Sequence, residues 1–218
     1  MTKLVKADLH LHTCYSMDCA MTLEQVIDRC VEIGINCLAI TDHDTIDGAL
    51  RLKEVAPFTV IVGEEILTTG GEVIGLFLTH RVPSGLSPEE TISRIKSQGG
   101  LVCIPHPYDT LRLSASRDSL FESLMPHIDI VEVFNARSLS PSSTDKAWQL
   151  ARKYGKPASA GSDAHSPQEI GNACVEMPPF NDKHSFIASL EQGKITGKRS
   201  SPAVHFHSTW ARLKKKLF

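Results

Sequence analysis

Histidine and acidic residues recur in this sequence at the ends of short apolar runs. His10 and His12 end the run ADLHLH, and Asp163 and His165 follow the run KPASAG. Residues two apart on a strand point to the same face, so each pair can direct two side chains at one ion. Imidazole nitrogens and carboxylate oxygens are common protein ligands of Zn, Mn and Fe. The spacing of both pairs therefore indicates a metal site.

Three further apolar runs end in the same kinds of residue. His43 follows one run in AITDHDT, Glu64 and Glu65 follow another in VGEEI, and His106 follows a third in CIPHPYD. Each motif alone is also typical of a surface hydrogen bond or a helix cap. Polar groups gathered at so many run ends would be costly unless a cation paired them, which favours metal binding for the whole set. Four other histidines are scattered and are expected to be structural or solvated: His127, His184, His205 and His207.

The apolar runs themselves predict seven strands, and the segments between most of them have helical spacing, as at Leu23, Val26 and Cys30. Strands that alternate with helices predict a mostly parallel sheet or barrel, whose ligands lie at the carboxyl ends of the strands. The short stretch EEILTTGGE instead predicts a hairpin that turns at 68–71. Strands are expected over 3–9, 36–41, 58–63, 72–78, 100–105, 129–134 and 156–161, and helices over about 45–55, 118–125, 143–154 and 182–192 and after the caps Thr22 and Ser87.

The composition is that of an ordinary globular protein. The chain has 218 residues, of which 41% are hydrophobic and 22% charged, and these values exclude a disordered or fibrous protein. Its six cysteines form no CxxC pair, so reduced, buried thiols are expected. No apolar run approaches the ~20 residues of a membrane span, and Met1 begins no signal peptide. A soluble, cytoplasmic protein with a single domain over 1–200 is therefore expected.

Charge is unevenly distributed along the chain. The formal net charge is −2, but no acidic residue follows Glu191. The acidic bulk argues against broad binding to nucleic-acid phosphates, so no stable nucleic-acid complex is expected, and it suits cation binding. Residues 201–218 form a basic amphipathic tail, in which Trp210 and Leu213 lie among Arg212 and several lysines. Such a tail can dock on the barrel, touch an acidic membrane, steer nucleic acid or remain solvated.

Five motifs in this order resemble the polymerase and histidinol phosphatase (PHP) domain family. They are ADLHLHTCYSMD, AITDHDTIDG, VGEEI, PHPYD and AGSDAH, and the similarity extends over residues 5–175. The segment from IDIVEVFNAR to EIGNA also resembles the C-terminal part of bacterial PHP phosphoesterases. The resemblance implies a distorted (β/α)7 TIM-like barrel of the α/β class, two or three divalent ions, and hydrolysis of phosphate esters.

The resemblance also implies which residues hold each ion. Glu65 rather than Glu64 corresponds to the family's single glutamate, because it directly precedes the hydrophobic Ile66. Asp18, in the SMD that follows HTCY, takes a position where the family has aspartate or histidine. The implied ligands are His10, His12, Glu65 and Asp163 for the first ion, Glu65 and His106 for the second, and Asp18, His43 and His165 for the third.

One position departs from the family pattern. Many members have a histidine at the start of the next strand as a ligand of the second ion, and this chain has Glu72 there. The expected hairpin returns Glu72 to the side of Glu65, whereas His80 would lie roughly 26 Å along the strand at ~3.3 Å per residue. Glu72 is therefore favoured over His80. A carboxylate makes this second site harder and favours Mn, Fe or Mg over Zn there. For the cluster as a whole the expected ions are Mn, Fe or Zn, with their identity open.

A phosphate substrate would need positive charge beyond the metals. Candidates near the barrel mouth are Arg137 with Asn135, and Arg112 and Arg117, which have an equally good explanation as solvated surface arginines. The substrate that the resemblance implies is a small phosphomonoester, including nucleotides, or an oligonucleotide end.

Two functions from different classes follow. The first is a metal-dependent phosphoesterase in which a hydroxide bridging two ions attacks phosphorus, with Glu65 and Asp163 holding the ions and Arg137 stabilising the transition state. The second is a non-catalytic metal-binding PHP module with a structural or partner-binding role. The filled ligand positions favour catalysis. No GxxxxGKT, GxGxxG or GxSxG motif supports an ATP-driven, nicotinamide-dependent or serine-hydrolase function.

Overall fold

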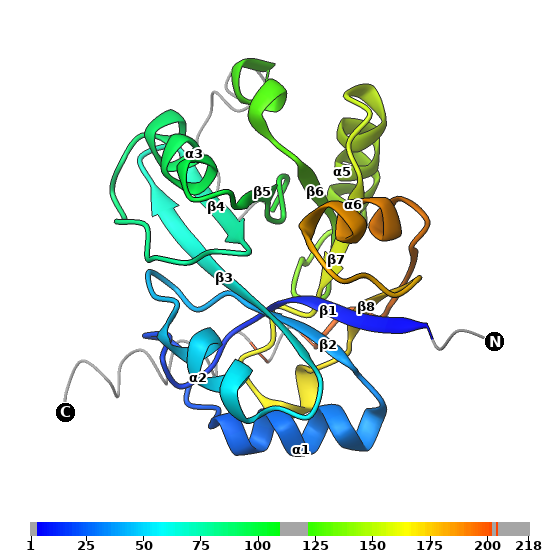
Figure 1. The fold of residues 1–218 in the computed structure, drawn as a ribbon. Coiled ribbons are helices and arrows are strands. Elements are labelled where there is room, and N and C mark those ends of the chain that lie inside the picture. Colours follow the sequence, from blue (N-terminus) through cyan, green and yellow to red (C-terminus); the bar gives the residue numbers. More distant parts are fainter. Residues whose placement is uncertain (1–3, 110–121, 202–203, 205–218) are drawn as a thin grey trace.

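One curved sheet contains the nine strands found among the described residues, in the order β7-β6-β5-β4-β3-β2-β1-β8-β9. The structure is a computed structural model that describes residues 4–109, 122–201 and 204. The sheet bends into a nearly closed barrel with the helices around its outside (Figure 1). The strands are β1 (Val5–Leu11), β2 (Cys37–Ile40), β3 (Thr59–Thr68), β4 (Gly71–Leu76), β5 (Leu101–Ile104), β6 (Ile130–Asn135), β7 (Ala158–Gly161), β8 (Ala173–Met177) and β9 (Lys194–Gly197).

The helices begin where the capping residues predict. Thr22 and Gln25 form a capping box at the first helix, and Ser87 accepts a hydrogen bond from Glu90 N at the third, so both predicted starts are confirmed. Residues 118–121 of the helix expected over 118–125 lie outside the described residues. The helices are α1 (Leu23–Ile33), α2 (Asp47–Val55), α3 (Pro88–Ser97), α5 (Pro141–Lys153) and α6 (Lys183–Glu191), with short 3-10 helices η2 (Met125–His127) and η3 (Pro167–Glu169).

The strand directions bring the carboxyl ends of several strands to one mouth of the barrel. β1, β2 and β3 pair in parallel, as do β5, β6 and β7, while β4 runs antiparallel between β3 and β5. Thr68 pairs with Gly71, which confirms the predicted hairpin and its turn. β7 meets β1 at the mouth, where His12 N donates to Ala164 O at 3.1 Å and Asp163 N donates to His10 O at 2.8 Å. These two bonds join β7, at one end of the sheet, to β1 and so close the barrel.

All seven predicted strands are present and the predicted α/β barrel is confirmed, but β8 and β9 were missed. β8 pairs antiparallel with β1, and β9 pairs antiparallel with β8. β8 follows the short helix η3 rather than a full α-helix, so strand–helix alternation did not indicate it. β9 is the short and largely exposed segment KITG, which lacks the apolar alternation that indicates a strand.

The parallel strands are apolar throughout because both of their faces are buried. All four residues of β2 are buried: Leu38 and Ile40 pack into one hydrophobic cluster, and Cys37 and Ala39 pack into the other. Five of the six cysteines are buried, as expected, and the structure contains no disulfide among the described residues. Within the part of the chain that the structure describes, no helix is both long and apolar enough to cross a bilayer.

A buried carboxylate holds the loop after β1 against the start of α2. Asp42 accepts hydrogen bonds from Thr13 N at 2.6 Å and from Thr13 Oγ1 at 2.7 Å. A Cβ on Gly48, in the first turn of α2, would lie 2.1 Å from Asp42 Oδ2 and 2.7 Å from Thr13 Oγ1. Only glycine therefore allows α2 to approach this closely, and the contact holds the loop that carries Asp18.

Gly48→Ala is expected to lower the free energy of unfolding by about 1–3 kcal/mol, because the added methyl group must displace the Asp42 carboxylate. Urea denaturation measures the change. Leu50→Ala is the matched control, because Leu50 lies on the same helix and is 41% exposed, and it is expected to stay within about 0.5 kcal/mol of the parent. Equal denaturation midpoints for the two variants would contradict the close packing at Gly48.

Candidate metal centre

The predicted ligands converge at the barrel mouth. His10 lies in β1, Glu65 in β3 and Glu72 in β4, and the others follow the ends of β1, β2, β5 and β7. His106 and Asp163 have positive φ angles of 28° and 53°, which are rare outside glycine. Residues in such conformations persist where the surrounding contacts hold them, and they cluster at functional sites.

The innermost group joins two histidines to two carboxylates. The Nε2 atoms of His10 and His12 lie 3.2 Å apart. His12 Nε2 lies 3.4 Å from Glu65 Oε2 and 3.2 Å from Asp163 Oδ1, and His10 Nε2 lies 3.4 and 3.7 Å from the same two oxygens. Ligand atoms around a tetrahedral ion with bonds of about 2.0 Å stand about 3.3 Å apart. The separations therefore fit donors that face a common cation, and all four side chains are buried.

A second group lies nearer to solvent. Asp18 Oδ2 is 3.3 Å from His43 Nε2 and 3.2 Å from His165 Nε2. Ser16 Oγ donates to the other oxygen of Asp18 at 2.8 Å, which orients the carboxylate. Asp18, His43 and His165, together with His12, place donor atoms within 4.8 Å of one another. The side chains of Asp18 and His43 are 17% and 15% exposed, so this group lies on the open side of the cluster.

Glu65 links the groups. Its Oε1 lies 3.0 Å from His106 Nε2, and its Oε2 lies 3.3 Å from His43 Nδ1. Glu72 Oε2 lies 3.8 Å from His106 Nε2. Glu72 pairs with Leu67 in the hairpin, and Leu67 shares a strand face with Glu65 because the two are two residues apart. The hairpin thus brings Glu72 to the cluster.

His80 lies away from these groups. Its side chain is exposed, and its Nδ1 lies 2.9 Å from Thr79 Oγ1. Of the two alternatives for this position, the structure therefore brings Glu72 and not His80 beside His106.

Burial and neighbouring charges shift the pKa values of the cluster. Burial disfavours the charged form of each group, yet Glu65 and Asp163 raise the pKa of His12 to about 9, and three carboxylates raise that of His10 well above its usual value. Conversely, the imidazoles hold the pKa of Glu65 and of Asp18 far below the usual range. In the metal-free protein the carboxylates thus draw protons onto the imidazoles, and a divalent cation would supply the same positive charge.

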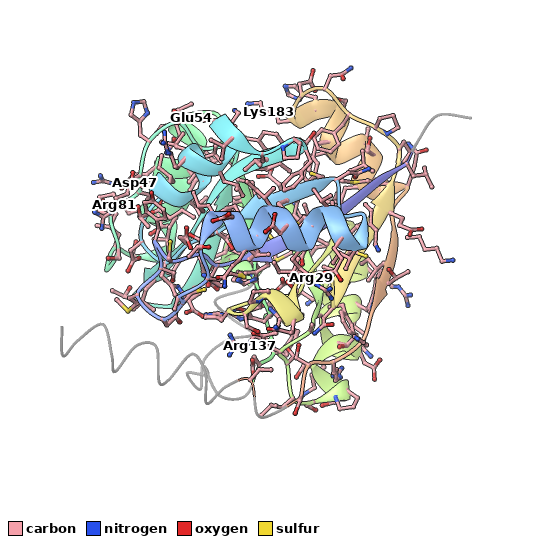
Figure 2. The ribbon with its side chains drawn as sticks, turned by 90° about the horizontal axis from the view of Figure 1, so that it is seen from below. Arg29, Asp47, Glu54, Arg81, Arg137 and Lys183 are labelled. Atoms are coloured by element: carbon pink, nitrogen blue, oxygen red, sulfur yellow. The ribbon has the colours of Figure 1, made fainter. Side chains whose placement is uncertain are left out.

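Arg137 lies at the mouth, but its guanidinium group is directed at protein acceptors. Nη1 donates to Asp163 O at 3.3 Å and contacts His165 Nδ1, and Nη2 donates to Val204 O at 3.3 Å. Nε lies 3.6 Å from Glu169 Oε1, and Figure 2 shows Arg137 beside the short helix η3 that carries Glu169.

Burial above all lowers the pKa of His165 to about 4. A histidine that stays neutral is suited to bind a metal.

The other predicted substrate residues differ in what can be said of them. Asn135 Nδ2 donates to Glu132 Oε2 at 3.1 Å and to Asp163 Oδ2 at 3.3 Å, and Asn135 Oδ1 accepts from Arg137 N at 2.9 Å. The amide is therefore bonded within the cluster. Two predicted substrate residues lie outside the described residues: Arg112 and Arg117.

Glu132 is part of the cluster and was missed in the sequence. Its Oε1 accepts from His10 Nδ1 at 3.1 Å, and its Oε2 accepts from His106 N at 2.7 Å. The available signal was an acidic residue in the middle of the apolar run DIVEVF, which otherwise predicts a buried strand. Glu64 points elsewhere, since its Oε2 accepts from Val82 N at 2.8 Å.

Comparisons with known proteins identify relatives that match more than half of the chain. Two uncharacterized proteins of Methanocaldococcus jannaschii are similar to it. One is 35% identical over 181 residues, which are 81% of this chain and 72% of the relative. The other is 43% identical over 145 residues, which are 61% of this chain and 82% of the relative.

A solved structure has the same fold. It is a two-domain protein from Bacteroides vulgatus that contains a predicted PHP-like metal-dependent phosphoesterase. The match has a TM-score of 0.69 at 17% identity and covers 90% of this chain and 66% of the other. The family description "PHP domain" matches residues 8–135, and the description "PHP-associated" matches residues 141–195. The chain belongs to the PHP domain family.

Proposed function

We propose that this protein is a metal-dependent phosphoesterase that hydrolyses a phosphate ester at a site with two or three divalent ions. The observation that supports this most is the position of Glu65, whose two oxygens face His10 and His12, His43, and His106. One carboxylate therefore joins adjacent groups of potential metal ligands. Adjacent divalent ions are typical of enzymes that carry out displacements at phosphorus.

The proposed ligand sets are those that the family resemblance implies, with Glu72 added to the second. Glu72 joins His106 in this assignment, because the hairpin brings its carboxylate to that imidazole. The first ion would be held by His10, His12, Glu65 and Asp163, the second by Glu65, Glu72 and His106, and the third by Asp18, His43 and His165.

The donor chemistry bears on the identity of the metals. The first and third groups combine imidazoles with carboxylates, and such sites suit Mn, Fe and Zn alike. The second group has two carboxylates beside one imidazole. Its higher share of oxygen donors favours Mn or Fe over Zn at that position.

The bound ions would polarise the phosphoryl group and lower the pKa of a water molecule. The proposed ligands on the two sides of the site differ in their exposure to solvent. His10, His12 and Asp163 are buried, whereas Asp18, His43 and Glu72 are each 15–17% exposed. We expect the phosphate to approach from the exposed side.

Arg137 contributes positive charge beside the cluster in this proposal. Its guanidinium group lies against Asp163 and His165, so it can stabilise negative charge that develops on a phosphoryl group near these ligands. Nη2, which donates to Val204 O in the structure, is the atom through which Arg137 would contact a phosphate oxygen. Asn135 acts in the same region by holding the carboxylate of Asp163. The substrate class remains a small phosphomonoester, including nucleotides, or an oligonucleotide end.

His12→Ala and Asp163→Ala are each expected to lower hydrolysis of p-nitrophenyl phosphate by about 100-fold or more, because loss of a residue that merely supports a ligand already costs about 10–100-fold. Activity is measured after chelation and again after addition of Mn²⁺, together with the metal content of the purified protein. His184→Ala, at an exposed histidine away from the cluster, should retain the parental rate. Metal bound at full occupancy without any hydrolysis across phosphorylated substrates would leave the non-catalytic module as the function.

The metal-free protein is expected to lose stability as the pH rises from about 6.5 to about 9. The pKa of His12 rises from 6.5 to about 9 on folding, so in this window the folded state retains a proton that the unfolded state releases. The stabilisation is complete below about pH 6.5 and is lost as the pH passes through about 9. Urea midpoints of chelator-treated protein at both ends of the window test this, and His12→Ala should reduce the difference between them. Midpoints that rise with pH would refute the expectation.

Glu72→Ala is expected to lower the number of Mn²⁺ ions bound per chain and to slow hydrolysis, because it removes a proposed ligand of the second ion. Glu72→His should retain activity while shifting the metal preference toward Zn, because an imidazole replaces a charged oxygen donor. His80→Ala is the control and should match the parent protein. Titration with Mn²⁺ and Zn²⁺ decides the matter, and an inactive His80→Ala beside an unaffected Glu72→Ala would reverse the assignment.

A further inference from the structure

The carboxylate of Glu132 is hydrogen-bonded to three separate places in the cluster. It lies in β6 and is 2% exposed. It accepts from His10 Nδ1 at 3.1 Å, from His106 N at 2.7 Å and from Asn135 Nδ2 at 3.1 Å. A buried carboxylate is tolerated when hydrogen bonds replace its hydration, and these three donors provide them.

The first of these bonds sets the orientation of His10. With Nδ1 directed to Glu132, the Nε2 atom faces His12 Nε2 at 3.2 Å and Glu65 Oε2 at 3.4 Å. A histidine that binds a metal through one nitrogen typically donates the other N–H to a carboxylate, which fixes the ring and increases its basicity. Glu132 thus directs Nε2 of His10 at the proposed first ion.

The second bond holds the backbone of His106. This residue has a φ of 28°, a conformation that costs free energy outside glycine. Its N–H donates to Glu132 Oε2, while its Nε2 lies 3.0 Å from Glu65 Oε1. The same carboxylate therefore holds ligands of both the first and the second proposed ions.

The third bond extends the influence of Glu132 to Asp163. The Asn135 amide donates to Glu132 Oε2 and also, at 3.3 Å, to Asp163 Oδ2. Its other atom, Oδ1, accepts from Arg137 N, which fixes the direction in which the amide points. Asn135 therefore couples two carboxylates that would otherwise repel each other.

The backbone of β7 leaves little space around these groups. A Cβ on Gly161 would lie 2.2 Å from His10 Cβ and 2.9 Å from Glu132 Oε1. The carboxylate is thus enclosed between β7 and the ring it orients.

We propose that Glu132 is a positioning residue, which holds His10, His106 and, through Asn135, Asp163 in the arrangement that binds the cations. The proposal rests on the proposed function, because it concerns the same metal cluster. His10, His106 and Glu132 also place donor atoms within 4.8 Å of one another, so direct ligation by Glu132 is the competing arrangement. In the structure Glu132 Oε2 already accepts two N–H donors, which favours positioning.

Glu132→Gln separates these roles. The side chain keeps its shape, but its amide nitrogen cannot accept, so at least one of the three hydrogen bonds is lost. Calorimetric titration of metal-free protein with Mn²⁺ should show an unchanged number of ions per chain and a Kd raised about 10–100-fold. Hydrolysis of p-nitrophenyl phosphate should need more Mn²⁺ but recover much of its kcat at saturation. Glu176→Gln, at a half-buried strand glutamate that pairs with Lys6 far from the mouth, is the matched control and should bind Mn²⁺ like the parent.

Asn135→Ala provides a second test that keeps Glu132 in place. It should weaken Mn²⁺ binding with unchanged stoichiometry. The double variant Glu132→Gln/Asn135→Ala should raise the Kd for Mn²⁺ by less than the product of the two single fold-changes, because both substitutions act on the same hydrogen bonds. Should Glu132→Gln fail to fold, unchanged Mn²⁺ affinity in Asn135→Ala overturns the proposal.

The remaining outcomes are distinct. A Glu132→Gln protein with parental Kd overturns the positioning role while the proposed function stands. Loss of one Mn²⁺ per chain overturns it in favour of direct ligation. A parent protein that binds no Mn²⁺ refutes the proposed function, and the positioning role with it, before any variant is measured.

Discussion

The barrel mouth depends on the charge of one buried carboxylate. Glu65 has no exposed surface, and its two oxygens lie 3.0–3.4 Å from nitrogens of His10, His12, His43 and His106. A carboxylate removed from water costs several kcal/mol unless positive charge lies beside it. In the metal-free protein the raised pKa values of His10 and His12 favour protonated imidazoles there, which supply that charge. Protons and metal cations therefore compete for the same imidazole nitrogens. The strands that carry these residues meet around the bound positive charge.

Main-chain hydrogen bonds, rather than side chains, close the barrel at its mouth. Asp163 N donates to His10 O and His12 N donates to Ala164 O, so the two ligand pairs lie on strands that are bonded to each other. This closure requires a close approach, which Gly161 permits because any side chain there would overlap His10. The ligand pairs are consequently held at a separation set by the backbone, and loss of one side chain removes a donor without opening the barrel.

Seven of the nine described strands, and the convergence of the proposed ligands at the barrel mouth, could be predicted because both depend on local patterns. His10 and His12 are two residues apart on a strand, and Glu72 is set opposite Leu67 by a short hairpin. The role of Glu132 could not be predicted in this way, since it depends on three partners from distant parts of the chain. The partners of Arg137 are equally non-local, and strands β8 and β9 lack both the flanking helix and the apolar pattern that indicate a strand.

Burial orders the proposed ion positions. The donors of the first group are at most 2% exposed, and Glu132 orients one of them, so this group is preorganised and shielded from water. Asp18 and Glu72, at 17% exposed, belong to the outer groups, where water competes with the protein for the ion. If the proposed function holds, the first ion would be bound most tightly. By fixing Glu65 it would also keep His43 and His106 of the outer groups in position. Because the exposed donors are Asp18, His43 and Glu72, a phosphate would reach the cluster from the side of the outer groups, while the first group stays shielded behind Glu65.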